Sequence, residues 1–175
     1  MVIVIFRFGV TPLHIATSTG HTPCVELLAK WGANINTQES WGQTPLVIAT
    51  SKSRLHTMIA LIGLGADLEI KDYHHGQTAL HVACAGHDEE TILVLLDAGA
   101  DLTATDGTGL SPLGVALVNK SYRSVPLLLE YGAKLNDMDR ARLPQLLVAF
   151  VDQQCCKLDC VVMLREREGL FHFEN

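Results

Sequence analysis

The chain carries one block of about 33 residues four times in succession. Each copy opens on Thr or Ser, then Pro or Ala, then Leu, and each later holds a Gly-Ala pair at a nearly constant distance. A period of this length is typical of stacked arrays in which each unit packs only against its neighbours. We therefore expect a solenoid with an extended binding surface rather than a single reaction centre. The four starts are Thr11-Pro12-Leu13-His14, Thr44-Pro45-Leu46-Val47, Thr78-Ala79-Leu80-His81 and Ser111-Pro112-Leu113-Gly114.

The third copy, residues 78–110, predicts two short helices followed by a loop. Thr78 is a helix-capping residue, and the apolar residues after it predict a first helix that ends at Gly86-His87. Residues 92–96 predict a second helix, which Gly99 ends in the left-handed conformation. Helices this short are unstable alone, so each must bury its apolar face against neighbouring copies. The leucines expected to line one continuous core are Leu28, Leu61, Leu95 and Leu128.

The first copy holds a long run of signature residues in one register. They are Thr11-Pro12-Leu13-His14-Ile15-Ala16, Gly20-His21, Val25-Glu26-Leu27-Leu28 and Gly32-Ala33-Asn34-Ile35-Asn36. With these residues the chain resembles the ankyrin repeat family from residue 8 to about residue 140. The resemblance implies an all-α solenoid of helix-turn-helix units, stacked as a curved row of antiparallel pairs, with β-hairpin fingers on one side. It also implies that other proteins bind to the finger tips and to the inner, first helices.

The period divides the chain into four clear repeats and two less regular ends. Residues 1–10 are interpreted as the end of a finger, and because no polar capping repeat precedes them, we expect a piece of a longer array. The last finger is expected at residues 138–143, although Arg142 stands where the pattern has glycine. Residues 144–175 are expected to form a degenerate fifth repeat or a C-terminal cap and tail. The four repeats span residues 11–43, 44–77, 78–110 and 111–143.

Several positions inside the repeats depart from the ankyrin pattern. The glycine between the two helices is Gly20 in the first repeat, whereas Ser53 replaces it in the second. In the third repeat Gly86 stands one position early. Val47 and Gly114 replace the histidine of the start motif in the second and fourth repeats.

Composition and charge narrow the classes of partner. Of 175 residues, 48% are hydrophobic, enough for a continuous core, and the formal net charge is -6 at pH 7. Since an acidic chain offers no basic field to a phosphate backbone, we expect no nucleic-acid partner. The five cysteines do not form a disulfide framework, and no segment has the length of a signal peptide or a membrane span. We expect a soluble protein of the cytoplasm or nucleus, without membrane insertion.

Histidines and cysteines have both a chemical and a structural interpretation here. The resemblance implies that His14 and His81 order the helix starts and join repeats, and no nucleophile stands at a known spacing from them. The cysteines within residues 155–160 are interpreted as buried helix residues rather than metal ligands. His74 and His75, in an extended loop, should point apart, which disfavours a shared ion. We expect no metal and no cofactor.

Large aromatic residues at two finger tips are the strongest indication of a binding surface. Trp and Tyr are enriched at the energetic centres of protein interfaces, and Trp41 and Tyr73 stand at successive tips. Alternatively, these two rings pack on neighbouring fingers. Leu110 and Val118 should make the adjoining groove more apolar in the fourth repeat. The residues expected to bind a partner protein are Ser40, Trp41, Gln43, Ser51, Lys52, Tyr73, His74, His75, Thr108, Leu110, Val118 and Asn119.

The sequence therefore favours a non-catalytic module or scaffold that binds one or more proteins. An alternative is the substrate-recognition subunit of a ubiquitin ligase complex, since some ankyrin proteins carry a C-terminal adaptor box, although its motif is absent after the array. An enzyme is disfavoured because the chain has no phosphate loop, metal motif or nucleophile elbow. The resemblance also implies Asn36 as a candidate for hydroxylation, with Asn136 at the equivalent position.

Overall fold

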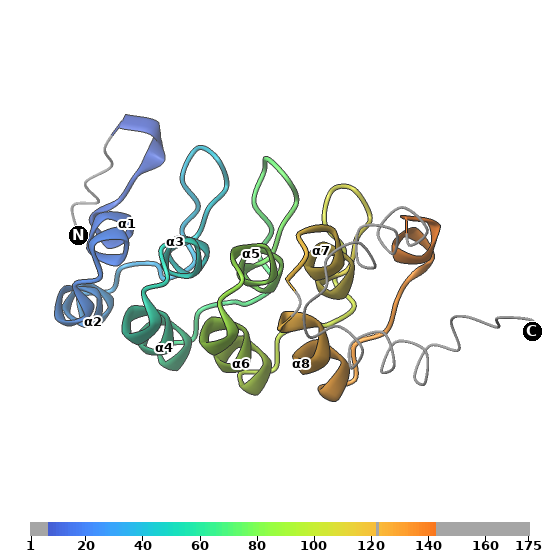
Figure 1. The fold of residues 1–175 in the computed structure, drawn as a ribbon. Helices are drawn as coiled ribbons and strands as arrows, with labels where there is room; N and C mark the ends of the chain where they lie inside the picture. Colours follow the sequence, from blue (N-terminus) through green and yellow to red (C-terminus); the bar gives the residue numbers. More distant parts are fainter. Residues whose placement is uncertain (1–6, 122, 143–175) are drawn as a thin grey trace, which may run out of the picture.

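The computed structural model describes residues 7–121 and 123–142 of the chain. Within these residues the protein is a stack of helix pairs without any strand, which confirms the all-α solenoid. Figure 1 shows two rows of helices, with α1, α3, α5 and α7 nearest the projecting loops and α2, α4, α6 and α8 on the far side. We call the first row the inner helices and the second the outer helices. The elements are η1 (Arg7–Gly9), α1 (Pro12–Thr19), α2 (Thr22–Lys30), α3 (Pro45–Ser51), α4 (Leu55–Gly63), α5 (Ala79–Gly86), α6 (Glu89–Asp97), α7 (Pro112–Val118) and α8 (Ser124–Glu130).

The inner helices begin where the start motif predicts. The hydroxyl oxygen of Thr44 accepts the backbone N–H of Val47 at 3.3 Å. The hydroxyl oxygen of Ser111 likewise accepts the backbone N–H of Gly114 at 3.1 Å. Proline follows the cap in three of the four inner helices, where its missing N–H leaves no intrahelical bond unmade. These local signals position each inner helix at the base of the loop that precedes it.

Each pair of helices is joined by one residue in the left-handed conformation. This residue is Gly20 in the first repeat, as predicted, with a φ of 77°. In the third repeat it is His87, so the helix ends at Gly86-His87 as predicted, and Gly86 stands one position before the left-handed residue. Ser53 and Lys120 fill the same position in the second and fourth repeats, with φ of 50° and 58°. The backbone therefore keeps one turn geometry even where the sequence has no glycine.

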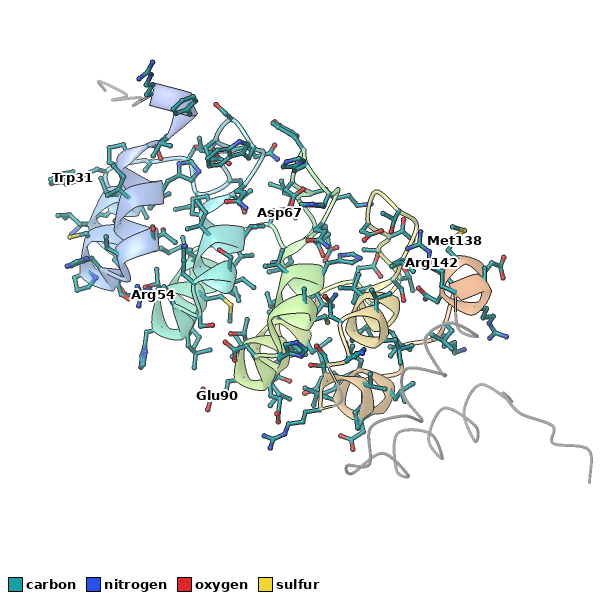
Figure 2. All side chains as sticks on the ribbon, turned by 45° about the horizontal axis from the view of Figure 1, so that its top comes forward. Trp31, Arg54, Asp67, Glu90, Met138 and Arg142 are labelled. Atoms are coloured by element: carbon teal, nitrogen blue, oxygen red, sulfur yellow. The ribbon has the colours of Figure 1, made fainter. Side chains whose placement is uncertain are left out.

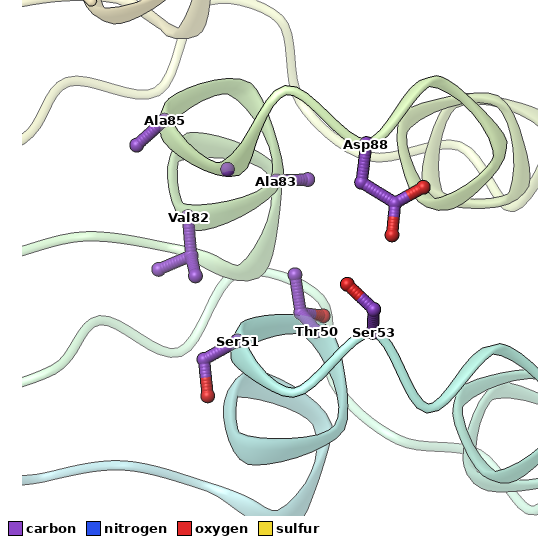
Figure 3. A pocket seen from close by; sticks show the side chains of 8 residues that line it. Thr50, Ser51, Ser53, Val82, Ala83, Ala85 and Asp88 are labelled. Carbon is purple, nitrogen blue, oxygen red and sulfur yellow. The ribbon is translucent and has the colours of Figure 1, made fainter.

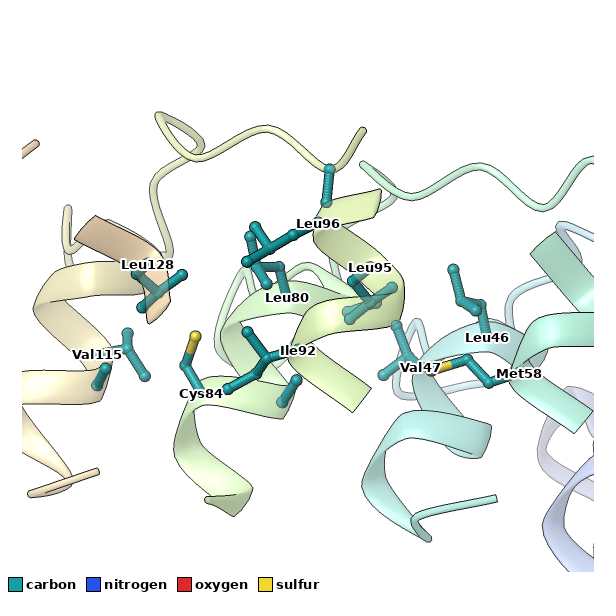
Figure 4. Close-up of a cluster of buried hydrophobic side chains, with 14 of the residues drawn as sticks. Leu46, Val47, Met58, Leu80, Cys84, Ile92, Leu95, Leu96, Val115 and Leu128 are labelled. Carbon is teal, nitrogen blue, oxygen red and sulfur yellow. The ribbon is translucent and has the colours of Figure 1, made fainter. Parts of the chain in front are cut away.

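The core runs through the stack between the two helix rows (Figure 4). Leu61, Leu95 and Leu128 are fully buried in three successive repeats, as the register predicts. Leu28, in the first repeat, packs against this core but is only half-buried, so its expected place in the continuous core is confirmed only in part. Among the described residues only the second repeat packs against the first, which leaves this leucine partly uncovered.

The projecting loops, which we call fingers, are hairpin-shaped but contain no paired strands in the described residues. Each is closed by a backbone bond across its tip, and the second finger closes from Asp72 N–H to Gln77 O at 2.9 Å. Single backbone bonds also join neighbouring fingers. They run from Ser40 N–H to Phe8 O, from Tyr73 N–H to Trp41 O and from Gly107 N–H to His75 O, at 2.9, 2.9 and 2.7 Å.

Residues 137–142 are helical, so the finger predicted at residues 138–143 is wrong as far as the described chain extends. Asn136 caps this turn, because its side-chain oxygen accepts the backbone N–H of Asp139 at 2.8 Å. Arg142 stands where a finger needs glycine, so nothing favours the tight turn back. The expected cap at residues 144–175, with its three cysteines, lies outside the described residues.

Candidate functional site

A carboxylate shapes the tip of each described finger. Glu39, Asp72 and Asp106 occupy the same register, 33 and then 34 residues apart. Glu39 Oε1 accepts the backbone N–H groups of Trp41 and Gln43 at 3.0 and 3.1 Å. Asp72 Oδ1 likewise accepts the N–H groups of the two histidines that follow Tyr73, at 3.0 and 2.7 Å. Because each carboxylate turns toward its own loop, the residues between these contacts project from the tip.

The third finger uses the same device. Asp106 Oδ1 accepts the N–H groups of Thr108 and Leu110 at 2.8 and 3.0 Å, together with the Thr108 hydroxyl at 2.8 Å. Partial burial alone would raise the pKa of Asp106, but these hydrogen bonds outweigh it and hold the pKa below its usual range. The carboxylate is therefore ionised, and its charge is bound within the finger.

His14 and His81 hold the fingers to the inner helices. Nδ1 of His14 accepts the backbone N–H of Thr11 at 3.1 Å, which leaves Nε2 as the donor to the carbonyls of Thr37 and Gln43 at 3.0 and 3.2 Å. His81 repeats this arrangement, with its Nε2 3.2 Å from Leu110 O. Burial lowers the pKa of both rings, so both stay neutral at neutral pH. The predicted structural role of the two histidines is confirmed.

The fourth repeat replaces this histidine by a different arrangement, which the sequence did not lead us to expect. Asp139 is fully buried, and its carboxylate accepts the backbone N–H and the hydroxyl of Ser111 at 3.1 and 2.5 Å. A side chain at Gly114 would collide with it, since a Cβ there would lie 1.8 Å from Asp139 Oδ1. The one available signal was that Asp139 shares the register of the three finger carboxylates.

Trp41 and Tyr73 lie at the tips of adjacent fingers and remain largely exposed, at 60% and 69%. Tyr73 also packs on the preceding finger. Its hydroxyl donates to Gln38 Oε1 at 3.1 Å, and its ring lies so close to Gly42 that a Cβ there would be 2.6 Å from Tyr73 Cγ. The two expectations for Tyr73 therefore both hold in part: one side of the ring is held by a neighbouring finger, and most of its surface stays accessible.

His74 and His75 are exposed and lie with their rings stacked, 4.8 Å apart between centroids and 23° from parallel. The expectation that the two rings point apart is wrong, because residues 73–75 form a turn rather than an extended segment. No cluster of three or more ligating side chains is found among residues 7–121 and 123–142.

The other predicted partner-binding residues divide into exposed and buried positions. Ser51 and Lys52 end α3, Val118 and Asn119 end α7, and these four side chains are exposed, as are Ser40 and Thr108 at the finger tips. Gln43 is half-buried, and its backbone carbonyl oxygen accepts a hydrogen bond from His14. Leu110 is only 4% exposed, so the prediction that it lines the groove is wrong. Its side chain packs into the core beneath the third finger.

A shallow hollow of about 300 Å³ lies between the ends of α3 and α5. Figure 3 shows Ser51, Val82 and Ala85 toward one side of it, and Ser53 and Asp88 toward the other. Burial would raise the pKa of Asp88, but hydrogen bonds from Thr91 and Ser53 outweigh it and lower the pKa. The hollow is lined by Thr50, Ser51, Ser53, Val82, Ala83, Ala85, Gly86 and Asp88.

Three remaining features bear on function. Burial raises the pKa of the Cys84 thiol, so this cysteine is a packing residue and not a nucleophile. The side-chain oxygen of Asn36 accepts the backbone N–H of Asp67 at 2.9 Å, and hydroxylation of Asn36 stays a prediction. None of the helices in the described part of the chain combines the length and the apolar character needed to cross a bilayer.

The family model for ankyrin repeats (3 copies) matches residues 4–72 and 71–139 of the chain. A Rickettsia bellii (strain RML369-C) chain named as an ankyrin repeat protein is 43% identical over 72 residues, covering 39% of this chain and 30% of the relative. Mouse protein phosphatase 1 regulatory subunit 27 (Mus musculus) is 44% identical over 59 residues, or 34% of this chain and 38% of its own. The Arabidopsis thaliana E3 ubiquitin-protein ligase XBAT32 is 37% identical over 76 residues, or 42% of this chain and 15% of its own.

Proposed function

The chain belongs to the ankyrin repeat family, and on this premise we propose that it is a non-catalytic module that binds a partner protein across its fingers and inner helices. We call this surface the finger-tip face, and it comprises Ser40, Trp41, Ser51, Lys52, Tyr73, His74, His75, Thr108, Val118 and Asn119. Because the chain spans less than two fifths of the length of the relatives it matches, the partners and activities in their names are not carried over directly.

The observation that supports this proposal best is the exposure of two large aromatic rings on adjacent fingers. Exposed loop tips are commonly small and polar, whereas Trp41 and Tyr73 offer large rigid surfaces at little cost in side-chain entropy. Both rings sit on backbone that the finger carboxylates and the inter-finger bonds hold in place. A preorganised aromatic surface loses less conformational entropy on binding than a flexible loop does.

We expect the double substitution Trp41→Ala with Tyr73→Ala to weaken partner binding by about 2 kcal/mol or more without changing the fold. The measurement is a quantitative pull-down from cell extract with the full chain, followed by titration of the proteins that the double variant loses. Trp31→Ala is the matched control, because Trp31 is 66% exposed but ends the outer helix α2 and points away from the stack (Figure 2). If the double variant and the control recover the same proteins equally, the finger-tip face is not the binding surface.

A second candidate is substrate recognition for a ubiquitin ligase, favoured by the similarity to a protein named as an E3 ubiquitin-protein ligase. The aligned segment is only 15% of that relative, so the similarity does not by itself carry ligase activity over to this chain. Under this candidate the finger-tip face would hold the substrate, and a ligase adaptor would be recovered with the full chain regardless of Trp41 and Tyr73. Recovery that contains no adaptor or ligase component would leave the general binding module as the better account.

A further inference from the structure

Charge is distributed unevenly between the two sides of this acidic protein. The inner helices α1, α3, α5 and α7 contain no Asp, Glu, Lys or Arg at all. The residues that follow two of them are exposed lysines, Lys52 after α3 and Lys120 beyond α7. The inner row is thus a neutral surface bordered by positive charge.

The carboxylates at the finger tips are engaged by their own loops. Glu39 and Asp72 are buried, Asp106 is half-buried, and all three accept hydrogen bonds from their own loops. His74 and His75 are exposed at the second of these tips.

The exposed carboxylates of the described chain lie on the outer helices or in the stretches that follow them. Glu26 stands on α2, Glu90 and Asp97 on α6 and Glu130 on α8, whereas α4 carries no carboxylate. The remaining exposed carboxylates are Asp67 and Glu69 after α4, Asp101 after α6 and Asp137 after α8. Figure 2 shows Glu90 at the edge of the molecule opposite the fingers. The exposed carboxylates of residues 7–121 and 123–142 therefore lie outside the finger-tip face.

We propose that the partner segment bound by the finger-tip face is an acidic peptide that also carries an aromatic or large aliphatic side chain. This inference rests on the proposed function and names the chemistry of its partner. Carboxylates of the peptide would lie near Lys52 and the paired rings of His74 and His75, while its apolar side chain would contact Trp41 and Tyr73. A basic segment would instead be drawn to the exposed carboxylates on α6 and α8 and in the stretches after the outer helices.

The inner row also has the shape for such a segment. The hollow between α3 and α5 is walled by the small apolar side chains of Val82, Ala83 and Ala85, and Lys52 follows directly after its Ser51 wall. Asp88, the one carboxylate in this hollow, is engaged by Thr91, whose N–H and hydroxyl it accepts at 3.2 and 2.8 Å. Its charge is therefore partly compensated inside the protein.

Nucleic acid fits this surface less well than an acidic peptide does. A phosphate backbone carries one charge per nucleotide and is bound by tracks of lysine and arginine. The finger-tip face has too few fixed positive charges for such a track, with Lys52 as its only lysine and no arginine. The exposed aromatic rings and the hollow favour peptide side chains spaced along an extended segment.

The test selects a random peptide library on the immobilised full chain and keeps the peptides whose binding depends on Trp41 and Tyr73. We expect these peptides to be enriched in Asp and Glu together with aromatic or large aliphatic residues. Their affinity should fall as NaCl is raised from about 50 mM to about 300 mM. Lys52→Glu should lower the affinity of these peptides about fivefold or more, because it replaces attraction by repulsion at the binding surface.

The matched control is Lys30→Glu, which makes the same change of charge at an exposed position on the outer helix α2. It should leave the affinity within about twofold, because a surface charge this far from the peptide is screened. Circular dichroism of both variants checks that the fold is kept.

Two failures can be told apart. If no selected peptide depends on Trp41 and Tyr73, the finger-tip face is not a peptide-binding surface, and the proposed function fails together with this inference. If dependent peptides are found but are neutral or basic, or if Lys52→Glu and Lys30→Glu act alike, only the acidic partner is overturned. Tighter binding of single-stranded DNA than of the selected peptides would also overturn it.

Discussion

At the scale of single residues, the fourth position of the start motif is occupied in three different ways; we call this position the slot. His14 and His81 fill it with an imidazole, and Val47 fills it with an apolar side chain buried in the core. In the fourth repeat Gly114 leaves the slot empty, and the carboxylate of Asp139 enters it from the following segment. The sequence shows each replacement but not its compensation, because the compensating residue is distant in the chain and belongs to a helix where a finger was expected.

Gly114→Ala should therefore destabilise the protein, although alanine is the better helix former. The added Cβ would lie 1.8 Å from Asp139 Oδ1, so the carboxylate must leave the N–H and hydroxyl of Ser111. Buried groups that lose such partners cost about 1–3 kcal/mol each, and we expect a loss in this range by urea unfolding.

Gly63→Ala is the control for this substitution. Gly63 ends α4, and no atom lies within 4 Å of the position of its Cβ. Alanine there should stabilise the protein by up to about 1 kcal/mol through helix propensity alone. If Gly114→Ala behaves like Gly63→Ala, Asp139 does not occupy the slot.

At the scale of elements, local sequence signals predict the inner helices well, but they predict the turns and the fingers only in part. Capping residues and prolines place the starts of the inner helices correctly. The inter-helix turns need one left-handed residue, and Ser53 and Lys120 adopt this conformation although neither residue type favours it. The helix at residues 137–142 was missed because residues 138–143 were interpreted as a finger, and Asn136 was considered for hydroxylation and not as a helix cap.

Lys120→Gly should stabilise the protein, in contrast to the usual effect of introducing glycine. Lys120 is exposed and held at a φ of 58°, a conformation that costs a side-chain-bearing residue about 1–2 kcal/mol and glycine almost nothing. After the larger entropy of glycine in the unfolded chain is subtracted, we expect a gain of about 0.5–1 kcal/mol by thermal or urea unfolding.

Gly20→Ala tests the same turn in the opposite direction. Gly20 has a φ of 77° in the first repeat, and a Cβ there would meet Arg54 Cδ at 3.1 Å. We expect a loss of about 1 kcal/mol, since alanine cannot adopt this conformation without strain.

A loss of stability in Lys120→Gly would show that the lysine side chain contributes more than its backbone strain costs.

At the scale of the whole molecule, stability should behave as a property of neighbouring repeats rather than of separate domains. Leu95 is fully buried in the third repeat, between the second and the fourth, and Leu28 holds the same register in the first repeat but is half-buried. Leu95→Ala should cost about 2–5 kcal/mol, whereas Leu28→Ala should cost clearly less, because its site is already partly open to solvent.

Because α6 packs against both α4 and α8, the loss at Leu95 should also spread. Amide hydrogen exchange of Leu95→Ala should therefore be faster in α4 and α8 as well as in α6. In Leu28→Ala the acceleration should be confined to α2 and the two helices it packs against, α1 and α4. Exchange that accelerates only within the substituted repeat would mean that the repeats unfold independently. The finger-tip face could then not act as one surface, because a partner that spans several fingers needs them held together.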